Sequence, residues 1–126
     1  MKFLLVDDEQ DILELVASFL ELEFEGAKIE KVSDGIDAVI SVTEQKFDLI
    51  ITDHKMDKMN GTEFVYNMRN MESSKNKTTP TIILSGFIPL VKESLAEDDK
   101  LIFMDKPFQP EDFIRKIKLL TGNKNA

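Results

Sequence analysis

Residues 3–16 read Phe-Leu-Leu-Val-Asp-Asp-Glu-Gln-Asp-Ile-Leu-Glu-Leu-Val: an apolar run, five polar residues of which four are acids, and then apolar residues at helical spacing. Because every position of Phe3–Val6 is apolar, this run predicts a strand that is buried on both faces. From Ile12 the apolar positions recur three and four residues apart, which predicts a helix that ends near Gly26. The stretch therefore predicts one strand–helix unit with acids at its junction.

The same unit recurs along the rest of the chain. Four further runs predict strands at Lys28–Val32, Leu49–Thr52, Thr81–Leu84 and Leu101–Met104. Helical patterns follow each of these strands. Strict alternation of strand and helix implies a parallel sheet with right-handed crossovers and helices on both faces. The predicted fold class is thus α/β, a doubly wound five-stranded parallel sheet.

Capping signals locate most of the helices. Asp34 is a favourable N-cap, and Asn60 with Glu63 has the spacing of a capping box. Pro110 suits a first helical turn, whereas a helix at Pro89–Asp98 is short and poorly patterned. The residues predicted to share an apolar face are Ile36, Val39, Ile40 and Thr43 after the first cap, Phe64, Val65 and Met68 after the second, and Phe113, Ile114, Ile117 and Leu120 in the last helix.

The composition of the 126 residues fits one globular domain. About a third of the residues are Leu, Ile, Val or Phe, and 32% are charged. No apolar run approaches the roughly 18 residues that span a bilayer, so we expect no membrane insertion. The chain has no cysteine, which excludes disulfides and thiol chemistry and favours a cytoplasmic protein. We expect a single domain at 1–122, a short tail at 123–126 and no output domain.

The net charge of −8 is unevenly distributed, with −10 on residues 1–63 and +2 on residues 64–126. An acidic chain lacks the basic face that phosphate contacts require, so we expect no direct binding to nucleic acid. The acidic half could hold a divalent cation or attract a basic partner. For most of these charges, a solvated surface is the simpler interpretation.

Polar side chains follow four of the predicted strands. Asp7 and Asp8 follow the first strand, Asp53 the third, Ser85 the fourth and Lys106 the fifth. In sheets of this type, sites form at the carboxyl ends of the strands. Converging carboxylates repel one another, and Mg²⁺ relieves that repulsion through carboxylate, carbonyl and water ligands. A lysine and a hydroxyl opposite the ion suit phosphoryl transfer, with Asp53 as the nucleophile.

Taken together, these segments resemble the receiver domain of two-component response regulators, of the single-domain chemotaxis-regulator type. The matching segments are Val6–Glu9, Asp53–Gly61, Ser85–Gly86 and Lys106–Phe108, in the family's order and with compatible spacing. The resemblance covers essentially the whole chain and implies the flavodoxin-like strand order 2-1-3-4-5.

The resemblance implies a role for each site residue. Asp53 would accept a phosphoryl group from a sensor histidine kinase or a histidine phosphotransfer protein. Asp8 and Asp53 would bind Mg²⁺, or Mn²⁺ as the alternative ion, with Asp7 acting through water and Lys55 through its backbone carbonyl. Lys106 and Ser85 would bind phosphate oxygens. The chain would thus be no enzyme beyond its own phosphorylation and dephosphorylation, and its phosphorylation would switch the binding of a downstream protein.

The resemblance also implies which residues act in the conformational switch and which affect the rate of dephosphorylation. Phe103 lies where the family has its switch aromatic, and it would respond to the phosphoryl group through Ser85. Lys55 and Phe87 lie where the family's side chains flank the hydrolytic water, and we expect them to slow dephosphorylation. Asp57 stands where the family often has proline. His54, the one histidine, is interpreted as structural because it should alternate away from the site.

Two alternatives remain open at the level of sequence. A degenerate receiver would bind partners without phosphorylation; intact Asp53, Asp8 and Lys106 argue against it. An aspartate-based, Mg²⁺-dependent phosphatase would need a second acid two residues after the nucleophile, where Lys55 stands. For the receiver, we expect a basic partner-binding face formed by cations of the later half, namely Lys92, Lys100, Arg115, Lys116 and Lys118.

Overall fold

The computed structural model describes residues 1–86 and 98–122. The strands are β1 (Lys2–Val6), β2 (Lys28–Val32), β3 (Leu49–Asp53), β4 (Thr81–Ser85) and β5 (Leu101–Asp105). The helices are α1 (Gln10–Glu23), α2 (Gly35–Glu44), α3 (Gly61–Asn70) and α5 (Pro110–Thr121). The helix expected at Pro89–Asp98 lies outside the described residues except for Asp98, which forms an isolated bridge with Leu101.

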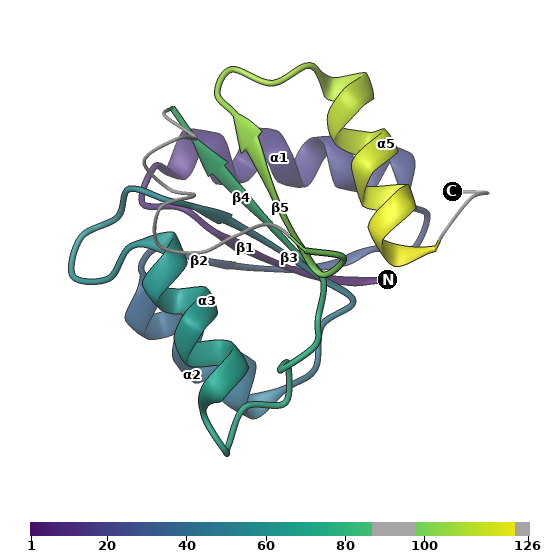
Figure 1. Cartoon of the computed structure of the whole chain (residues 1–126). Coiled ribbons are helices and arrows are strands. Elements are labelled where there is room, and N and C mark those ends of the chain that lie inside the picture. The colour runs from purple at the N-terminus through teal and green to yellow at the C-terminus, as the bar shows by residue number, and fades with distance from the viewer. Residues whose placement is uncertain (87–97, 123–126) are drawn as a thin grey trace.

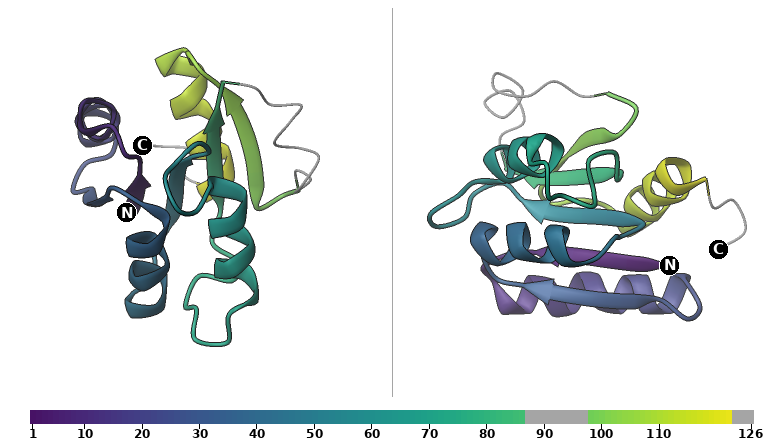
Figure 2. Two further views of the ribbon diagram at one scale, coloured as in Figure 1. Left: turned by 90° about the vertical axis from the view of Figure 1, so that its left-hand side faces the viewer. Right: turned by 90° about the horizontal axis from the view of Figure 1, so that it is seen from below.

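All five strands are parallel and lie in the order β2-β1-β3-β4-β5, which confirms the predicted sheet. Helices α1 and α5 cover one face of the sheet, and α2 and α3 cover the other (Figures 1 and 2). The winding direction reverses between β1 and β3. From β1 the chain moves outward to β2 at one edge of the sheet, whereas from β3 it moves outward to β4 and then β5 at the other edge. The carboxyl ends of these two central strands are therefore the expected place for a site.

Alternation along each strand builds a separate core on each face of the sheet. Phe3 and Leu5 point toward the α1 and α5 layer, and Leu4 and Val6 point toward α2 and α3. All four are buried, as a strand covered on both sides requires. Strand β2 lies at the edge and is partly exposed, which matches its half-polar sequence.

The capping predictions are confirmed. The Asp34 side chain accepts a hydrogen bond from the Asp37 N–H at 2.8 Å, and Asn60 forms a capping box with Glu63. Pro110 occupies the first turn of α5. Phe64, Val65 and Met68 face inward with no exposed surface, as predicted.

The predicted apolar face of α2 is correct at Val39, which packs against the core, and wrong at Ile36 and Ile40. Ile36 and Ile40 are 45% and 48% exposed, whereas Ala38 and Val42 are fully buried. The small Ala38 lets the helix approach both the sheet and α3, so the helix turns this narrower stripe inward. The branched side chains of Ile36 and Ile40 are left on the outer surface.

The loop between α3 and β4 is organised around one buried amide. Asn76 is fully buried and accepts hydrogen bonds from the Phe47 N–H and the Thr79 hydroxyl, both at 2.8 Å. Its amide group donates to the carbonyl oxygens of Val42 and Gln45 at 2.9 and 2.8 Å. One side chain therefore ties this polar loop to the end of α2 and the start of β3.

Candidate functional site

The sheet brings the predicted site residues to one edge. Asp7 follows β1, Asp53 and Ser85 are the last residues of β3 and β4, and Lys106 follows β5. The Asp7 N–H still donates to Val32 at 3.2 Å and the Lys106 N–H to Ser85 at 2.9 Å, so the backbone next to each side chain is held by a neighbouring strand. The functional groups therefore stand on rigid parts of the fold.

Three carboxylates form an acidic cluster. Asp7, Asp8 and Asp53 each offer an oxygen, and these oxygens lie within 4.8 Å of one another. Asp7 and Asp53 are buried, whereas Asp8 is exposed. Burial raises the pKa of Asp7 to about 6, the N–H of Glu9 works against that rise, and the neighbouring carboxylate of Asp53 adds to it. The negative charge of the three carboxylates is thus not fully compensated within the cluster.

The donor set fits a hard divalent cation. Carboxylate oxygens are the ligands that Mg²⁺ prefers, and the mixture of buried and exposed groups leaves room for waters. Asp7 Oδ2 is also buried without a hydrogen-bond partner within the described part of the chain. A buried carboxylate oxygen without a hydrogen bond is costly, and a cation or a cation-bound water would satisfy it.

Lys106 supplies the nearest positive charge. Its Nζ lies 2.7 Å from Asp53 Oδ1 and 3.8 Å from Asp7 Oδ2. Burial works to lower the pKa of Lys106, but the hydrogen bond to Asp53 and the surrounding carboxylates raise it above its ordinary value. The lysine therefore stays protonated and partly neutralises the cluster.

An open pocket of about 490 Å³ lies over these groups. Its lining combines the acceptor region with the loop that follows β3. The lining residues are Asp8, Glu9, Asp53, Lys55, Met56, Asp57, Ser85, Gly86 and Lys106. The Lys55 side chain is exposed and stands at this pocket, so a molecule that reaches Asp53 meets both Lys55 and Lys106.

The loop after Asp53 is fixed by close packing of its two ends. The Gly61 N–H donates to the His54 carbonyl at 2.8 Å, and the His54 N–H donates to Leu84 at 2.9 Å. A Cβ atom at Gly61 would lie 2.6 Å from the Asp53 carbonyl oxygen. The start of α3 therefore approaches the acceptor strand more closely than any side chain allows.

His54 itself lies outside the pocket lining, in agreement with its structural interpretation. Its Nδ1 is buried, and burial lowers the pKa of the ring below the ordinary value. We therefore expect a neutral imidazole there at pH 7.

Ser85 and Phe103, the two residues expected to form the switch, occupy neighbouring strands. Ser85 is buried at the end of β4, and Phe103 on β5 is 6% exposed and lies opposite Ile83. The Phe103 ring belongs to the core cluster on the α2 and α3 side. The ring is thus turned inward in this structure. Phe87, the second residue expected to affect the phosphate lifetime, lies outside the described residues.

Three residues of this region were missed by the sequence-based assignment of roles. Glu9 and Met56 line the pocket, and the backbone of Gly61 packs directly against the backbone of Asp53. The position of Glu9 directly after two acids was a usable signal. Nothing in the sequence distinguishes Met56 from an ordinary core methionine, because its burial at the pocket depends on the path of the loop.

Comparison with known proteins agrees with this geometry. Residues 3–118 match the family described as the response regulator receiver domain. A CpxR homologue of Haemophilus influenzae is 30% identical over 94% of this chain and 49% of its own length. The response regulator SaeR of Staphylococcus aureus is 30% identical over 96% of this chain and 51% of its own length. The chain thus spans about half the length of these curated relatives.

Solved structures show the same fold. The chemotaxis response regulator CheY4 of Vibrio cholerae is 30% identical, with a TM-score of 0.79 over 94% of this chain and 97% of that one. The receiver domain of the sensor histidine kinase PA1611 of Pseudomonas aeruginosa is 23% identical, with a TM-score of 0.82 over 97% and 98% of the two chains. That structure has a magnesium ion coordinated in its active-site cleft. The family match spans residues 3–118 and so includes both core clusters and the site residues at the strand ends. This chain therefore belongs to the response regulator receiver domains of two-component systems.

Proposed function

We propose that the chain accepts a phosphoryl group on Asp53, in a Mg²⁺-dependent reaction, from a phosphohistidine on a sensor histidine kinase or histidine phosphotransfer protein. Phosphorylation then changes the binding of a downstream protein. The observation that supports this most directly is the contact of Lys106 with Asp53 beside the acidic cluster, at the floor of an open pocket. Receiver domains are signalling domains and not turnover enzymes, which fits one acceptor that reacts once per signal.

The reaction transfers a phosphoryl group from nitrogen to oxygen. A carboxylate oxygen of Asp53 forms a bond to phosphorus, the bond from phosphorus to the donor's imidazole nitrogen breaks, and the electron pair of that bond stays on the imidazole. Lys106 holds the other oxygen of Asp53 and so orients the nucleophile. The Lys106 ammonium and the Ser85 hydroxyl then donate to phosphoryl oxygens, which stabilises the charge that develops there.

A divalent cation completes the charge balance. Asp8 and Asp53 would hold Mg²⁺ directly, Asp7 through water and Lys55 through its backbone carbonyl. The bound ion would neutralise the carboxylates and the incoming phosphoryl oxygens. The protein's own contribution is to fix these ligands at the ends of β1 and β3, where the backbone is rigid.

We propose that the switch acts through Ser85 and Phe103. A phosphoryl oxygen on Asp53 would draw the Ser85 hydroxyl toward it and leave room for the Phe103 ring to turn in. Since the ring already lies in the core cluster here, the other state must be one in which it turns outward. A difference of a few kcal/mol between the two arrangements is enough to shift the population.

The proposal also includes the bounds of the domain. We place the receiver domain at residues 1–122, with α5 as its last element, and a short tail at 123–126. Within the described ranges, no helix has both the length and the hydropathy needed to cross a bilayer.

The test is incubation with a small-molecule phosphodonor and Mg²⁺, followed by intact-mass measurement. One phosphoryl adduct should form on the wild-type chain and should disappear with a chelator. The adduct should be lost in Asp53→Asn and strongly reduced in Asp8→Ala. Asp57→Asn removes a carboxylate from the same pocket and serves as the matched control that retains the adduct. If Asp53→Asn is still phosphorylated, the assignment is wrong; if wild type never is, a phosphorylation-independent interaction module is favoured.

A further inference from the structure

A second polar pocket lies at the amino edge of the sheet, at the opposite end of the strands from Asp53 (Figure 1). It has a volume of about 480 Å³, within the range of pockets that hold small molecules. Its lining comes from the segments that lead into β3, β4 and β5 and from the end of α5. None of these residues lines the phosphoacceptor pocket, and the proposed phosphoryl transfer uses none of them.

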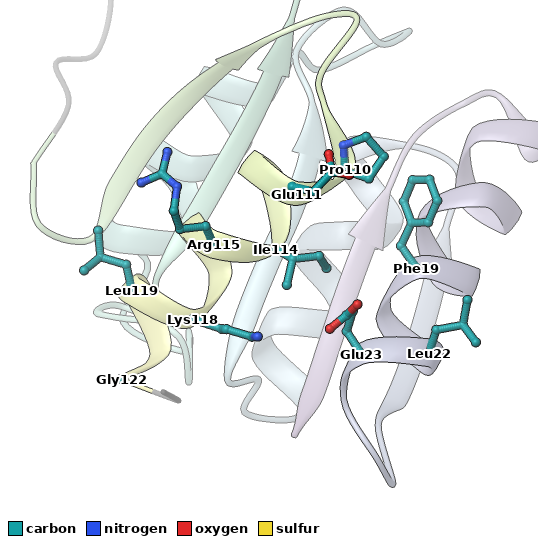
Figure 3. A pocket seen from close by; sticks show the side chains of 10 residues that line it. All are labelled: Phe19, Leu22, Glu23, Pro110, Glu111, Ile114, Arg115, Lys118, Leu119 and Gly122. Carbon is teal, nitrogen blue, oxygen red and sulfur yellow. The ribbon is translucent and has the colours of Figure 1, made fainter. Parts of the chain in front are cut away.

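The amino-edge pocket differs in charge from the larger groove between α1 and α5. Figure 3 shows that groove, in which the charged lining residues are two acids and two bases beside apolar side chains. At the amino-edge pocket, the charged residues in the described lining are Lys46, Lys100 and Asp48. Two ammonium groups therefore face one carboxylate across a hollow of small-molecule size.

The backbone around Lys46 is held by the buried Asn76 side chain. Asn76 accepts a hydrogen bond from the Phe47 N–H at 2.8 Å and donates to the Gln45 carbonyl oxygen at 2.8 Å. Both chain neighbours of Lys46 are thus fixed to the interior. This wall of the pocket is formed before any ligand arrives.

The backbone of Lys100 is held in a similar way on the other wall. Its N–H donates to the Asp98 carboxylate at 2.8 Å, and its carbonyl oxygen accepts from the Thr81 N–H at 2.9 Å. The second ammonium therefore also projects from a fixed backbone. Preformed walls lower the entropy that a ligand loses by ordering the site.

The positive charge of the pocket is not neutralised by its surroundings. The ion pairs that form among residues 1–86 and 98–122 involve other cations, and neither Lys46 nor Lys100 takes part in one. Asp48, the acid of the lining, accepts a hydrogen bond from the Lys2 backbone N–H at 2.7 Å. The pocket thus keeps an excess of positive charge that an anion would balance.

We propose that this pocket binds a small organic phosphate, a monoester whose doubly charged head lies between Lys46 and Lys100. An ammonium group binds phosphate as a compact point charge, and two of them match the two charges of the head. The exposed Thr78 adds a hydroxyl donor to the lining. Phe47 and Leu120 supply an apolar surface for a compact organic body.

The exposure of the lysines sets the expected strength. Both side chains reach solvent, so water and salt screen their attraction for an anion. We expect a dissociation constant of about 0.1–1 mM at low ionic strength. Binding should weaken as salt is added.

The test is a titration of the isotope-labelled chain with phenyl phosphate in chelator, followed by nuclear magnetic resonance. Saturable shifts should appear at the amides of Phe47 and Lys100. Lys46→Gln and Lys100→Gln should each weaken binding about three- to fivefold, and the double variant about tenfold or more. Lys77→Gln removes an exposed lysine that lies outside the lining and should bind like wild type.

Two further variants separate the effect of charge from general damage to the pocket. Lys100→Arg keeps the positive charge and should retain binding within about twofold. Asp48→Asn removes the acid but keeps an acceptor for the Lys2 N–H, so it should tighten binding about two- to threefold. A purely structural role of these residues would not produce opposite signs at Asp48 and the lysines.

The choice of probe tests the class of ligand. Benzoate carries one charge and should bind more weakly than phenyl phosphate, whereas benzyl alcohol carries none and should not saturate the pocket. Benzoate that binds as tightly as phenyl phosphate would overturn the assignment to a phosphate. Benzyl alcohol that does so would overturn the role of charge altogether.

Other outcomes bear on the site itself. The proposal fails if phenyl phosphate gives no saturable shift at this pocket up to about 10 mM, if its shifts are confined to the pocket at Asp53, or if the folded double lysine variant binds like wild type. Asp53→Asn should bind phenyl phosphate at the amino edge as wild type does. Failure of the phosphoacceptor proposal would therefore leave this test intact.

Discussion

Lys106 Nζ lies 2.7 Å from Asp53 Oδ1, although 53 residues separate the two along the chain. The contact exists because β3 and β5 both flank β4 in a parallel sheet, so their carboxyl ends reach the same edge. It gives the acidic cluster one fixed positive charge before any cation binds. The properties of the site therefore depend on how this charge, the carboxylates and the nearby backbone are balanced.

Loss of the ammonium should destabilise the protein when no divalent cation is present. In Lys106→Met, three carboxylates would face one another without compensation. We expect the free energy of unfolding in chelator to fall by about 1–3 kcal/mol, less than for a fully buried pair because Lys106 is partly exposed. Urea unfolding measures this, with Lys77→Met on the exposed loop as the control. Equal stability of the two variants would show that the contact contributes nothing.

Neutralisation of Asp7 should have the opposite effect on stability. A carboxyl with a pKa raised from 3.8 to about 6 by burial opposes folding when it is charged. Without Mg²⁺ at pH 7, Asp7→Asn should therefore be more stable than wild type, by an amount on the order of 2–3 kcal/mol. The same variant should gain less stability from added Mg²⁺. A variant less stable than wild type in chelator would contradict this account.

The pH dependence gives an independent check on Asp7. Because its folded pKa lies above its unfolded value, the folded state binds this proton first as the pH falls. The penalty is full above about pH 6 and disappears as the pH falls toward 3.8. The stability difference between Asp7→Asn and wild type, followed by urea unfolding in chelator, should thus shrink steadily between pH 7 and about pH 4.5. A difference that stays constant over this range would exclude Asp7 as its source.

A methyl group at Gly61 should disturb the acceptor loop. The added Cβ would lie 2.6 Å from the Asp53 carbonyl oxygen and 3.0 Å from the His54 Cα, both on the backbone, so the chain must shift. We expect Gly61→Ala to cost about 1–3 kcal/mol of stability and to slow phosphorylation of Asp53. Gly86→Ala is the matched control, since an added Cβ there meets nothing within 4 Å. The close approach would be irrelevant if both variants behaved alike.

Removal of the Asn76 amide should destabilise the fold without touching the site. Asn76→Ala would leave the buried Phe47 N–H and the carbonyls of Val42 and Gln45 without this partner. We expect a loss of about 2–4 kcal/mol in thermal or urea unfolding. Asn70→Ala, which removes a single exposed hydrogen bond, should cost much less. Phosphorylation of the folded Asn76→Ala fraction should be unchanged.

The lifetime of the phosphate tests the role of Lys55. Its ammonium cannot act as a general base while protonated, and its position at the pocket lets it shield the water's approach to Asp53. We expect the phosphorylated Lys55→Asn chain to lose phosphate faster than wild type, and the double variant with Phe87→Glu faster still. Decay of the intact-mass adduct after removal of the phosphodonor measures both. A double variant that decays no faster than wild type would remove both side chains from this role.

Local chemistry explains which elements could be predicted. Strands β1 and β3 contain the continuous apolar runs Phe3–Val6 and Leu49–Ile51. Asp34 and the Asn60–Glu63 pair are caps whose hydrogen bonds reach only three residues along the chain. Such signals are complete within a short window, so the structure reproduces them. The face of α2 was not predictable in this way, because Ile36 and Ile40 are as apolar as the residues that the helix actually buries. Its rotation follows from the close packing of Ala38 against neighbours that are distant in sequence.

By itself, the sequence determined the alternation of strands and helices, the caps, and which side chains stand at the carboxyl ends of strands. These properties depend on periodicity and on hydrogen bonds between near neighbours. Only the tertiary structure decided that Lys106 contacts Asp53 at 2.7 Å, that Asn76 holds Phe47, and that α1 and α5 enclose a groove. Each of these depends on the order of strands in the sheet and the approach of layers, and packing between residues far apart in the chain sets both.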